Sequence, residues 1–195
     1  MKWINVKPDI SAYNVDSITQ GWSAIDIVHL INETVDTPII ILPEQIRMKI
    51  MHHLRSRRVE LGGLLIGSVF SIDDLESGIV LISIKDAIAS HDFNSTAVSL
   101  SMSSSVWQHA NQSSDSKTFV VGWYHSHPNL GAYFSSTDRK TQKDFFKAPY
   151  NFGLVIDPFR EEEKWFIGEN SDPISSGYIK NDLYGLKKHN NPDYS

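Results

Sequence analysis

Two histidines and an aspartate stand along this chain at a spacing typical of a metal centre. His125 and His127 are separated by one residue, and Asp138 follows eleven residues later. On a β-strand, side chains two residues apart project from the same face at about 6.5–7 Å, so both imidazoles can reach one ion with Zn–N bonds of about 2.0–2.1 Å. Three protein ligands leave one position of a tetrahedral zinc ion open for water, which is the arrangement of a hydrolytic zinc centre.

The residues before His125 predict the strand that carries the two histidines. Residues 118–124 are rich in β-branched and aromatic side chains and run directly into the motif. Val121 and Trp123 have the same alternation as His125 and His127, so we expect the four side chains on one face of the strand. One face of this strand is therefore expected to pass from the packed core to the metal site.

A helix is predicted to begin next to Asp138. Ser135 and Ser136 are residues of the type that caps helices, and Asp138 stands three positions after Ser135. This S-x-x-D spacing resembles a capping box in which the acid is aspartate. The third ligand is therefore expected in the first turn of a helix, where its carboxylate can approach the ion from a second element.

Short apolar runs and amphipathic segments alternate along the rest of the chain. Residues 38–42 predict a strand that leads into a helix, with Pro43 at the first helical position and Ile46, Ile50 and Leu54 recurring along one face. The other predicted elements are a hairpin of two strands at residues 60–67 and 79–84, a further strand at 97–102 and a helix at 103–112. Two late strands are predicted at 151–158 and 164–167.

The composition excludes several classes of function. The 195 residues suffice for one well-buried core. The net charge of −5 comes without a long basic stripe, so we expect no nucleic-acid partner. The absence of cysteine excludes disulfides, thiolate zinc sites and a cysteine nucleophile. No run approaches about 20 apolar residues, and residues 1–8 lack the apolar core of a signal peptide, so we expect a cytoplasmic protein with no membrane partner.

The histidines and the aspartate belong to a longer pattern. H-x-H-P occupies residues 125–128, S-x-x-D occupies 135–138, and E-x-x-G stands upstream at 60–63. This pattern resembles the JAMM/MPN family of zinc metalloproteases, in particular its stand-alone prokaryotic members that are similar to deubiquitinases. The resemblance continues through Thr141-Gln142 and residues 155–158. It implies a mixed α/β fold of the cytidine-deaminase-like type, in which helices flank a central twisted mixed β-sheet.

The resemblance also implies a role for each residue of the pattern. His125, His127 and Asp138 would bind one Zn²⁺ per chain, and the ion would make its bound water acidic enough to supply hydroxide at neutral pH. Glu60 would be the general base that takes the proton and passes it to the departing amine. Ser135 would donate a hydrogen bond to the developing oxyanion, although its spacing to Asp138 is equally explained by a helix cap.

The substrate follows only from the resemblance, which implies cleavage after the C-terminus of a ubiquitin-like protein, in its conjugates. Similarity to prokaryotic members suggests a bacterial, antiviral-defence setting with E1- and E2-like enzymes of the same operon as further partners. The stretch between Asp138 and the strand near residue 151 is short and contains no cysteine or histidine, so no second zinc site is expected. An acidic turn at Asp73, Asp74 and Glu76 could meet a basic substrate tail.

Three other functions stay open. The protein could be a processing peptidase that matures the tail of a ubiquitin-like or sulfur-carrier protein. It could be a non-catalytic MPN scaffold, which the loss of a motif residue would signal, although none is lost. A small-molecule hydrolase such as a nucleobase deaminase is disfavoured because those sites usually need cysteine ligands.

The pattern also suggests how the chain is divided. We expect an N-terminal extension at residues 1–36, the JAMM/MPN metalloprotease domain at 37–169 and a polar C-terminal tail at 170–195. The tail is expected to be loosely held, because the chain beyond Glu169 is polar and weakly patterned.

Overall fold

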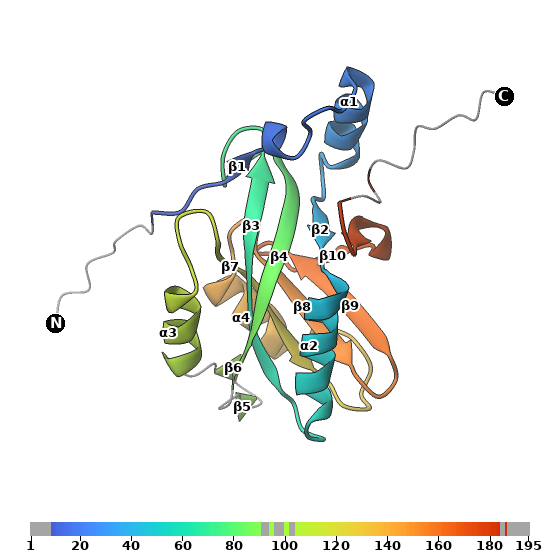
Figure 1. Cartoon of the computed structure of the whole chain (residues 1–195). Helices are drawn as coiled ribbons and strands as arrows, with labels where there is room; N and C mark the ends of the chain where they lie inside the picture. Colours follow the sequence, from blue (N-terminus) through green and yellow to red (C-terminus); the bar gives the residue numbers. More distant parts are fainter. Residues whose placement is uncertain (1–8, 91–93, 96–99, 102–103, 184–185, 187–195) are drawn as a thin grey trace.

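The computed structural model describes residues 9–90, 94–95, 100–101, 104–183 and 186. Within these residues nine strands form one mixed sheet in the order β10-β9-β8-β7-β3-β4-β2-β11, with β1 paired to β3, while β5 and β6 pair separately (Figure 1). The strands are β1 (Tyr13–Asn14), β2 (Ile39–Ile41), β3 (Gly62–Ser71), β4 (Ile79–Ala89), β5 (Asn94–Ser95), β6 (Leu100–Ser101), β7 (Phe119–Ser126), β8 (Phe152–Asp157), β9 (Glu162–Ile167), β10 (Asp172–Ile174) and β11 (Ile179–Lys180). The helices are α1 (Ala24–Glu33), α2 (Glu44–Arg55), α3 (Ser104–Gln112) and α4 (Ser136–Phe145), with short 3-10 turns at Val15–Ser17 and Ser176–Tyr178.

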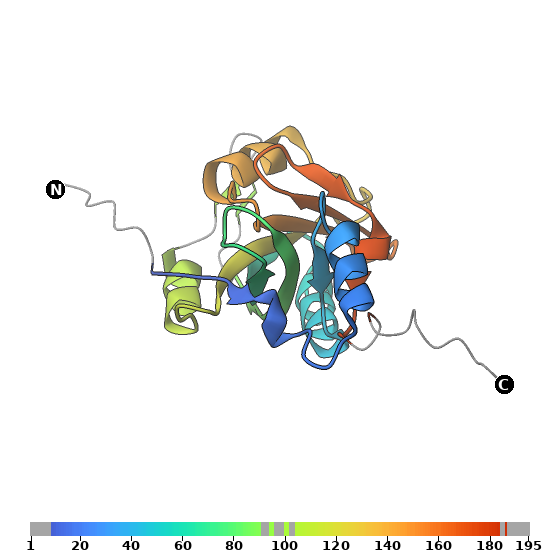
Figure 2. The same ribbon diagram turned by 90° about the horizontal axis from the view of Figure 1, so that it is seen from above.

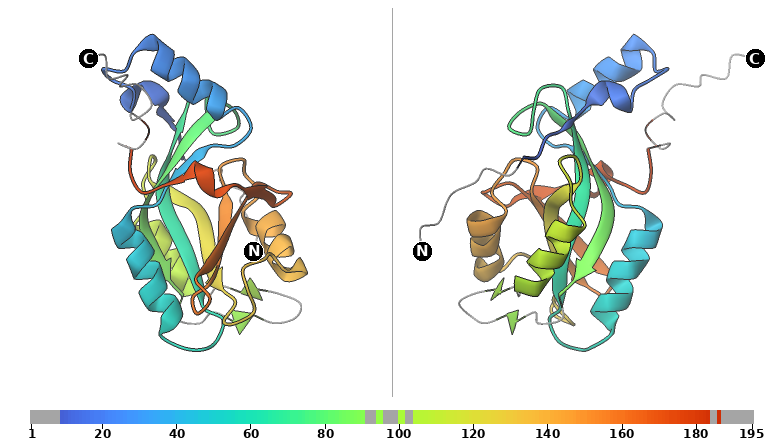
Figure 3. Two further views of the ribbon diagram at one scale, coloured as in Figure 1. Left: turned by 90° about the vertical axis from the view of Figure 1, so that its right-hand side faces the viewer. Right: turned by 60° about the vertical axis from the view of Figure 1, so that its left-hand side comes forward.

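Helices cover both faces of the sheet, as Figure 3 shows. On one face α2 buries Ile46, Ile50 and Leu54 against the strands, which confirms the predicted four-residue spacing. On the opposite face α3 contributes Val106 and Ala110 to a second apolar cluster, and α4 lies beside it. A mixed sheet flanked by helices is the predicted fold class, and it is confirmed.

The central strand β3 is buried along its whole length, and its side chains belong to apolar clusters on both faces of the sheet. Leu64 packs in the cluster beneath α3, and Leu65 packs in the cluster beneath α2. Gly63 allows the neighbouring strand to come close, since a Cβ at this position would lie 2.1 Å from the carbonyl oxygen of Ile88. The predicted hairpin is confirmed by the antiparallel pairing of β3 with β4.

One prediction about β7 is wrong. Val121 does not share a face with Trp123: Val121 packs with Tyr124 beneath α2, whereas Trp123 packs on the opposite face. The reason is a β-bulge, because the ladder between β3 and β7 shifts register directly after Leu65 and takes Val121 out of the alternation. Trp123 and His125 lie beyond the bulge and share a face, with their rings stacked.

Segments near both ends of the described chain join the sheet. β1 pairs in parallel with the end of β3, and α1 lies at the same end of the molecule (Figures 1 and 2). β10 pairs with β9, and β11 pairs with β2. The tail expected to be loosely held from residue 170 is therefore held by backbone hydrogen bonds at these strands, and Ile174 is buried. The division of the chain at residues 36 and 169 stays a prediction.

Two smaller predictions also differ from the structure. Pro43 occupies the N-cap position and is not the first helical residue, since α2 begins at Glu44. Of residues 97–102, expected to form a strand, Leu100–Ser101 pairs with β5 outside the main sheet, and the other residues lie outside the described chain.

The acidic turn between β3 and β4 lies far from the motif. β3 begins two residues after Glu60 and ends at Ser71, so its ten residues separate the turn from Glu60 by about 30 Å. Figure 1 shows the turn at the opposite end of the β3–β4 hairpin from the segment that precedes Gly62. This separation argues against a contact between the turn and substrate residues close to the metal ligands.

Candidate metal centre

The structure brings the two histidines and the aspartate together. His125 lies near the end of β7, His127 follows directly after it, and Asp138 lies in the first turn of α4. The Nε2 atoms of the two histidines are 3.2 Å apart. Asp138 places Oδ1 3.2 Å from Nε2 of His125 and Oδ2 3.5 Å from Nε2 of His127. All three side chains are buried, and each offers one ligand atom that lies within 4.8 Å of the other two.

This arrangement fits a zinc ion. Two ligand atoms at about 2.0–2.1 Å from a tetrahedral zinc lie about 3.3–3.4 Å apart. The two facing histidine nitrogens, 3.2 Å apart, are close to this value, and each of them has a different oxygen of Asp138 within 3.5 Å. Two imidazole nitrogens and one carboxylate form a typical donor set for catalytic zinc. A cation would also satisfy two histidine nitrogens that face each other in a buried space.

The electrostatics keep Asp138 and His127 in the forms that bind metals. Burial alone would raise the pKa of Asp138, but the hydrogen bonds and charge of His125 and the bonds from Ser135 lower this pKa to about 2. Burial, together with the neighbouring His125, lowers the pKa of His127 below its ordinary value. At neutral pH the carboxylate of Asp138 is therefore ionised and the imidazole of His127 is neutral.

The predicted capping box at the start of α4 is confirmed. The backbone N–H of Asp138 donates to Oγ of Ser135 over 3.2 Å, and the backbone N–H of Ser135 donates to Oδ2 of Asp138 over 2.7 Å. The second bond fixes the carboxylate next to the histidines. Oγ of Ser135 accepts one hydrogen bond here, and the Ser135 hydroxyl also interacts with the carboxylate of Asp138, in the partly exposed space beside the ligands.

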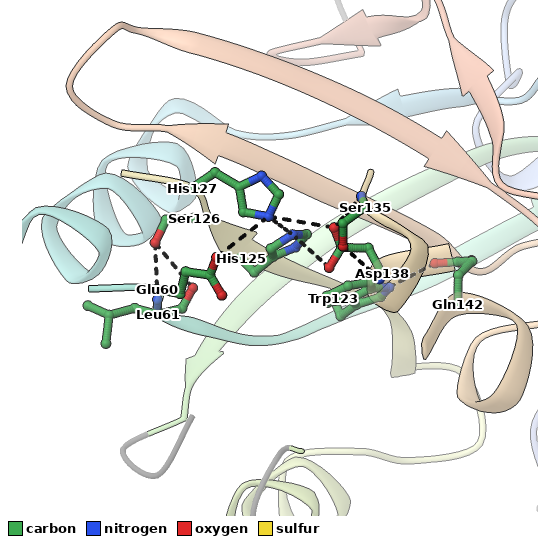
Figure 4. A network of polar contacts seen from close by, with 9 residues as sticks. All are labelled: Glu60, Leu61, Trp123, His125, Ser126, His127, Ser135, Asp138 and Gln142. Atoms are coloured by element: carbon green, nitrogen blue, oxygen red, sulfur yellow. Dashed lines mark hydrogen bonds and ion pairs between the residues drawn. The ribbon is translucent and has the colours of Figure 1, made fainter. Parts of the chain in front are cut away.

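Glu60 lies on the other side of the histidines from Ser135 (Figure 4). Its Oε1 is 4.0 Å from Nε2 of His127, and its side chain is 30% exposed. The segment that carries Glu60 is held by Ser126, the residue between the two histidines. The backbone N–H of Ser126 donates to the carbonyl of Leu61 over 2.8 Å, and the N–H of Leu61 donates to Oγ of Ser126 over 3.1 Å. The serine thereby links the predicted base to the ligand strand.

The loop between His127 and α4 is anchored by a hydrogen bond to the side chain of Asp157. One oxygen of this fully buried carboxylate accepts from the backbone N–H of Gly131 over 2.9 Å, and the other accepts from Phe159 over 3.1 Å. Gly131 has a φ of +86°, a conformation that favours glycine. Asp157 therefore ties the loop that joins two ligands to the turn after β8.

The sequence analysis did not predict the contacts by which Ser126, Trp123 and Gln142 support the site. Trp123 stacks on His125 with ring centroids 4.6 Å apart, and its Nε1 donates to Oε1 of Gln142 over 2.7 Å (Figure 4). The alternation along β7 could have placed Trp123 beside His125. No local pattern indicates that Gln142 is its partner, because the contact depends on how α4 packs on the sheet.

Comparison with known proteins supports the resemblance seen in the motif. The family described as prokaryotic homologs of the JAB domain matches residues 43–167. The ubiquitin carboxyl-terminal hydrolase RPN11 of Saccharomyces cerevisiae is 37% identical over 65 residues, which are 33% of this chain and 21% of that protein. The COP9 signalosome complex subunit 5 of Debaryomyces hansenii is 45% identical over 47 residues, which are 23% of this chain and 10% of that protein.

These matches are local, since the chain spans only 21% of the first relative's length and 10% of the second's. The family match covers well over half of the chain and includes Glu60, Ser135 and all three candidate ligands. Among the described residues no helix is long and apolar enough to cross a membrane. The chain belongs to the family of prokaryotic homologs of the JAB domain.

Proposed function

We propose that this protein is a zinc-dependent isopeptidase that cleaves the bond after the C-terminus of a ubiquitin-like protein. The relatives support the class of reaction, since one of them is described as a ubiquitin carboxyl-terminal hydrolase. The single observation that carries the proposal is the grouping of the three buried ligand atoms with the carboxylate of Glu60 within 4.0 Å of one of them. A structural metal site has no need of such a carboxylate.

His125, His127 and Asp138 would hold the metal. When bound, the ion would polarise the scissile carbonyl and increase the acidity of water. The neutral imidazole of His127 and the ionised carboxylate of Asp138 are already in the required protonation states at neutral pH, because of the pKa shifts described above. Metal binding would therefore release few protons from these two ligands.

Glu60 would move the proton. Its carboxylate is partly exposed and lies beside the ligands, so it can take a proton from the attacking water through Oε1. Water oxygen then bonds to the carbonyl carbon, and the C–N bond breaks. Glu60 delivers the same proton to the amine nitrogen, which leaves as the lysine side chain or peptide N-terminus, and the tail retains a carboxylate.

Ser135 would stabilise the charge that develops on the carbonyl oxygen. Its Oγ accepts from the backbone of Asp138, and its hydroxyl, which interacts with the Asp138 carboxylate, would turn to donate its proton to the oxygen that gains negative charge as water adds. Its position opposite Glu60 puts the donor and the base on two sides of the ligands (Figure 4). Removal of one such donor typically raises the barrier by about 2.7–4 kcal/mol.

The proposal is tested by incubating the purified protein with ubiquitin-like fusions in two forms, one joined to a lysine side chain and one joined head to tail. We expect cleavage after the C-terminus of the ubiquitin-like protein, loss of cleavage with a metal chelator, and recovery when zinc is restored. His125→Ala should be inactive, while the exposed His52→Ala retains full activity. Cleavage that survives both the chelator and His125→Ala would contradict the proposal.

The same assay separates the alternatives. Cleavage of the head-to-tail fusion only would identify a processing peptidase for a ubiquitin-like or sulfur-carrier tail. Stoichiometric zinc without cleavage of either fusion would identify a scaffold. E1- and E2-like partners, a bacterial defence setting and the boundaries of a catalytic domain at residues 37–169 belong to the same proposal, and cleavage of conjugates made by the neighbouring enzymes would support them.

A further inference from the structure

The two ligand histidines lack a feature that most metal-binding histidines have. The ring nitrogen that does not face the site usually donates to a carboxylate or a carbonyl, and this bond fixes the orientation of the ring. Here Nδ1 of both His125 and His127 is buried without a hydrogen-bond partner in the described part of the chain. Rotation of an imidazole about its Cβ–Cγ bond is intrinsically broad, so something else must hold these rings.

An aromatic ring lies against each histidine. Trp123 stacks on His125 with centroids 4.6 Å apart and planes only 11° from parallel. Tyr133 contacts His127 with centroids 4.8 Å apart and planes inclined by 58°. Phe134 also lies 5.8 Å from His125. Each imidazole is therefore confined by ring contacts at the distances at which aromatic pairs interact favourably.

Trp123 is itself held in place by α4. Its Nε1 donates to Gln142, and the amide of Gln142 donates in turn to the backbone carbonyls of Phe146 and Asn151 over 2.7 Å and 3.1 Å. The ring of Phe146 lies 5.8 Å from Trp123 and nearly parallel to it. α4 thus supplies Asp138 from its first turn and the support for His125 from its last turns.

We propose that Trp123 and Tyr133 are positioning residues of the metal centre, whose rings fix the imidazole planes of His125 and His127 in place of hydrogen bonds at Nδ1. The stack with Trp123 fixes the plane of His125, and the inclined contact with Tyr133 limits the rotation of His127. The contact of each Nε2 with Asp138 selects the edge of the ring that faces the site. This inference rests on the metal centre assigned under the proposed function and extends it to residues that bind neither metal nor substrate.

Tyr133 provides the cleaner test, because its side chain is 45% exposed and its removal leaves the core intact. Zinc affinity is measured by competition with a chromophoric chelator, and the geometry of the site is followed by the visible absorption of bound Co²⁺. Tyr133→Ala should weaken zinc binding about tenfold and alter the Co²⁺ spectrum, as loss of outer contacts to metal ligands does. Tyr133→Phe retains the ring and should restore both readouts.

Phe145→Ala is the matched control, since Phe145 is a more exposed aromatic residue at the far end of α4. It should bind zinc as the unchanged protein does. Trp123 is fully buried, so it is tested with Trp123→Phe, which can still stack, and Trp123→Leu, which cannot. Circular dichroism confirms that each variant is folded. We expect weaker zinc binding and an altered Co²⁺ spectrum for Trp123→Leu alone.

The inference would be overturned if Tyr133→Ala and folded Trp123→Leu had the same zinc affinity and Co²⁺ spectrum as the unchanged protein. The proposed function would then remain intact. If the unchanged protein bound neither Zn²⁺ nor Co²⁺, the metal centre itself would be wrong, and the proposed function would fall with it.

Discussion

Ser126 and Leu61 are joined by reciprocal hydrogen bonds, in which Ser126 N–H donates to the Leu61 carbonyl and Leu61 N–H donates to Ser126 Oγ. The pair fastens the segment after Glu60 to the strand that carries both histidines. Ser126, the residue between the two histidines, therefore helps to position the carboxylate of Glu60 beside the candidate ligands.

Replacing Ser126 with alanine should separate this task from metal binding. Ser126→Ala leaves the buried N–H of Leu61 without its partner, which costs about 1–3 kcal/mol in the free energy of unfolding. We expect kcat to fall on the order of tenfold to a hundredfold as Glu60 moves, with zinc stoichiometry unchanged. Ser68→Ala, at a buried serine of the neighbouring strand β3, is the control and should retain kcat. Unchanged kcat in Ser126→Ala would contradict the assigned task.

Glu60→Gln should abolish proton transfer while leaving the ligands in place. The amide cannot take a proton from water, so we expect kcat to fall by about 10²–10⁴-fold. Zinc content, measured by atomic emission, should equal that of the unchanged protein because Glu60 is not a ligand. Glu161→Gln, at an exposed glutamate paired only with Arg55 among the described contacts, should have no effect on kcat.

Ser135→Ala distinguishes oxyanion stabilisation from capping. Loss of the cap should lower the free energy of unfolding by about 1 kcal/mol. Ser23→Ala removes the equivalent cap of α1, where Oγ of Ser23 accepts from Asp26 N–H. We expect similar losses of stability in the two variants but a fall in kcat, by about 10²–10³-fold, in Ser135→Ala alone. Equal kcat values would reduce Ser135 to a cap.

Gly63 in the E-x-x-G motif should not tolerate a side chain. A Cβ there would meet the carbonyl oxygen of Ile88 at 2.1 Å and the ring of Tyr124 at 2.8 Å. Gly63→Ala is therefore expected to lower the free energy of unfolding by at least about 1–3 kcal/mol, measured by urea denaturation. A Cβ at Gly177 would meet only Oγ of Ser175, at 3.9 Å, so Gly177→Ala should be close to neutral. Equal stabilities would mean that β4 moves away without cost.

Asp157 should make stability depend on pH in the acid range. Burial raises the pKa of its carboxyl, but backbone N–H groups, those of Gly131 and Phe159 first among them, hold the pKa below its ordinary value. A carboxyl with a lowered pKa stabilises the fold above its unfolded pKa of about 3.9, and this contribution is lost as the pH falls through the folded value. Asp157→Asn should therefore cost about 1–3 kcal/mol at pH 7.

The difference between Asp157→Asn and the unchanged protein should shrink as the pH falls below about 4, because both then lack the charge. Urea denaturation at a series of pH values measures it. Asp144→Asn, at a more exposed carboxyl that pairs with Lys140, is the control and should show a much smaller effect. A difference that is constant with pH would exclude ionised Asp157 as the cause.

Local sequence was sufficient for the elements that hold the ligands. The spacing of Ile46, Ile50 and Leu54 identified a helix and its buried face, and the S-x-x-D spacing identified the capping box that fixes Asp138. The alternation from Trp123 to His125 also held. Each of these patterns depends on contacts within one turn or along one strand, and such contacts repeat with the period of the element.

Predictions that depended on distant pairing were less successful. A bulge opposite Leu65 moved Val121 to the other face, and β10 and β11 joined the sheet although their sequence is polar and weakly patterned. Such strands are stabilised by backbone hydrogen bonds to a neighbouring strand, which leave little trace in their own side chains. Local patterns therefore could not predict them.

For the site the division is equally clear. The types and spacing of His125, His127 and Asp138 predicted a set of candidate metal ligands, and the structure brings them together, because all three lie on two elements that are adjacent in the chain. Glu60 was found through the family pattern alone, since nothing in its neighbourhood marks it out among other carboxylates. The packing of β3, β7 and α4 decided where Glu60 lies beside His127. The same packing decided the reciprocal hydrogen bonds between Ser126 and Leu61 and the aromatic contacts with both histidines. Contacts between residues far apart in the chain form only when the strands pair and the helix packs, and no local period encodes them.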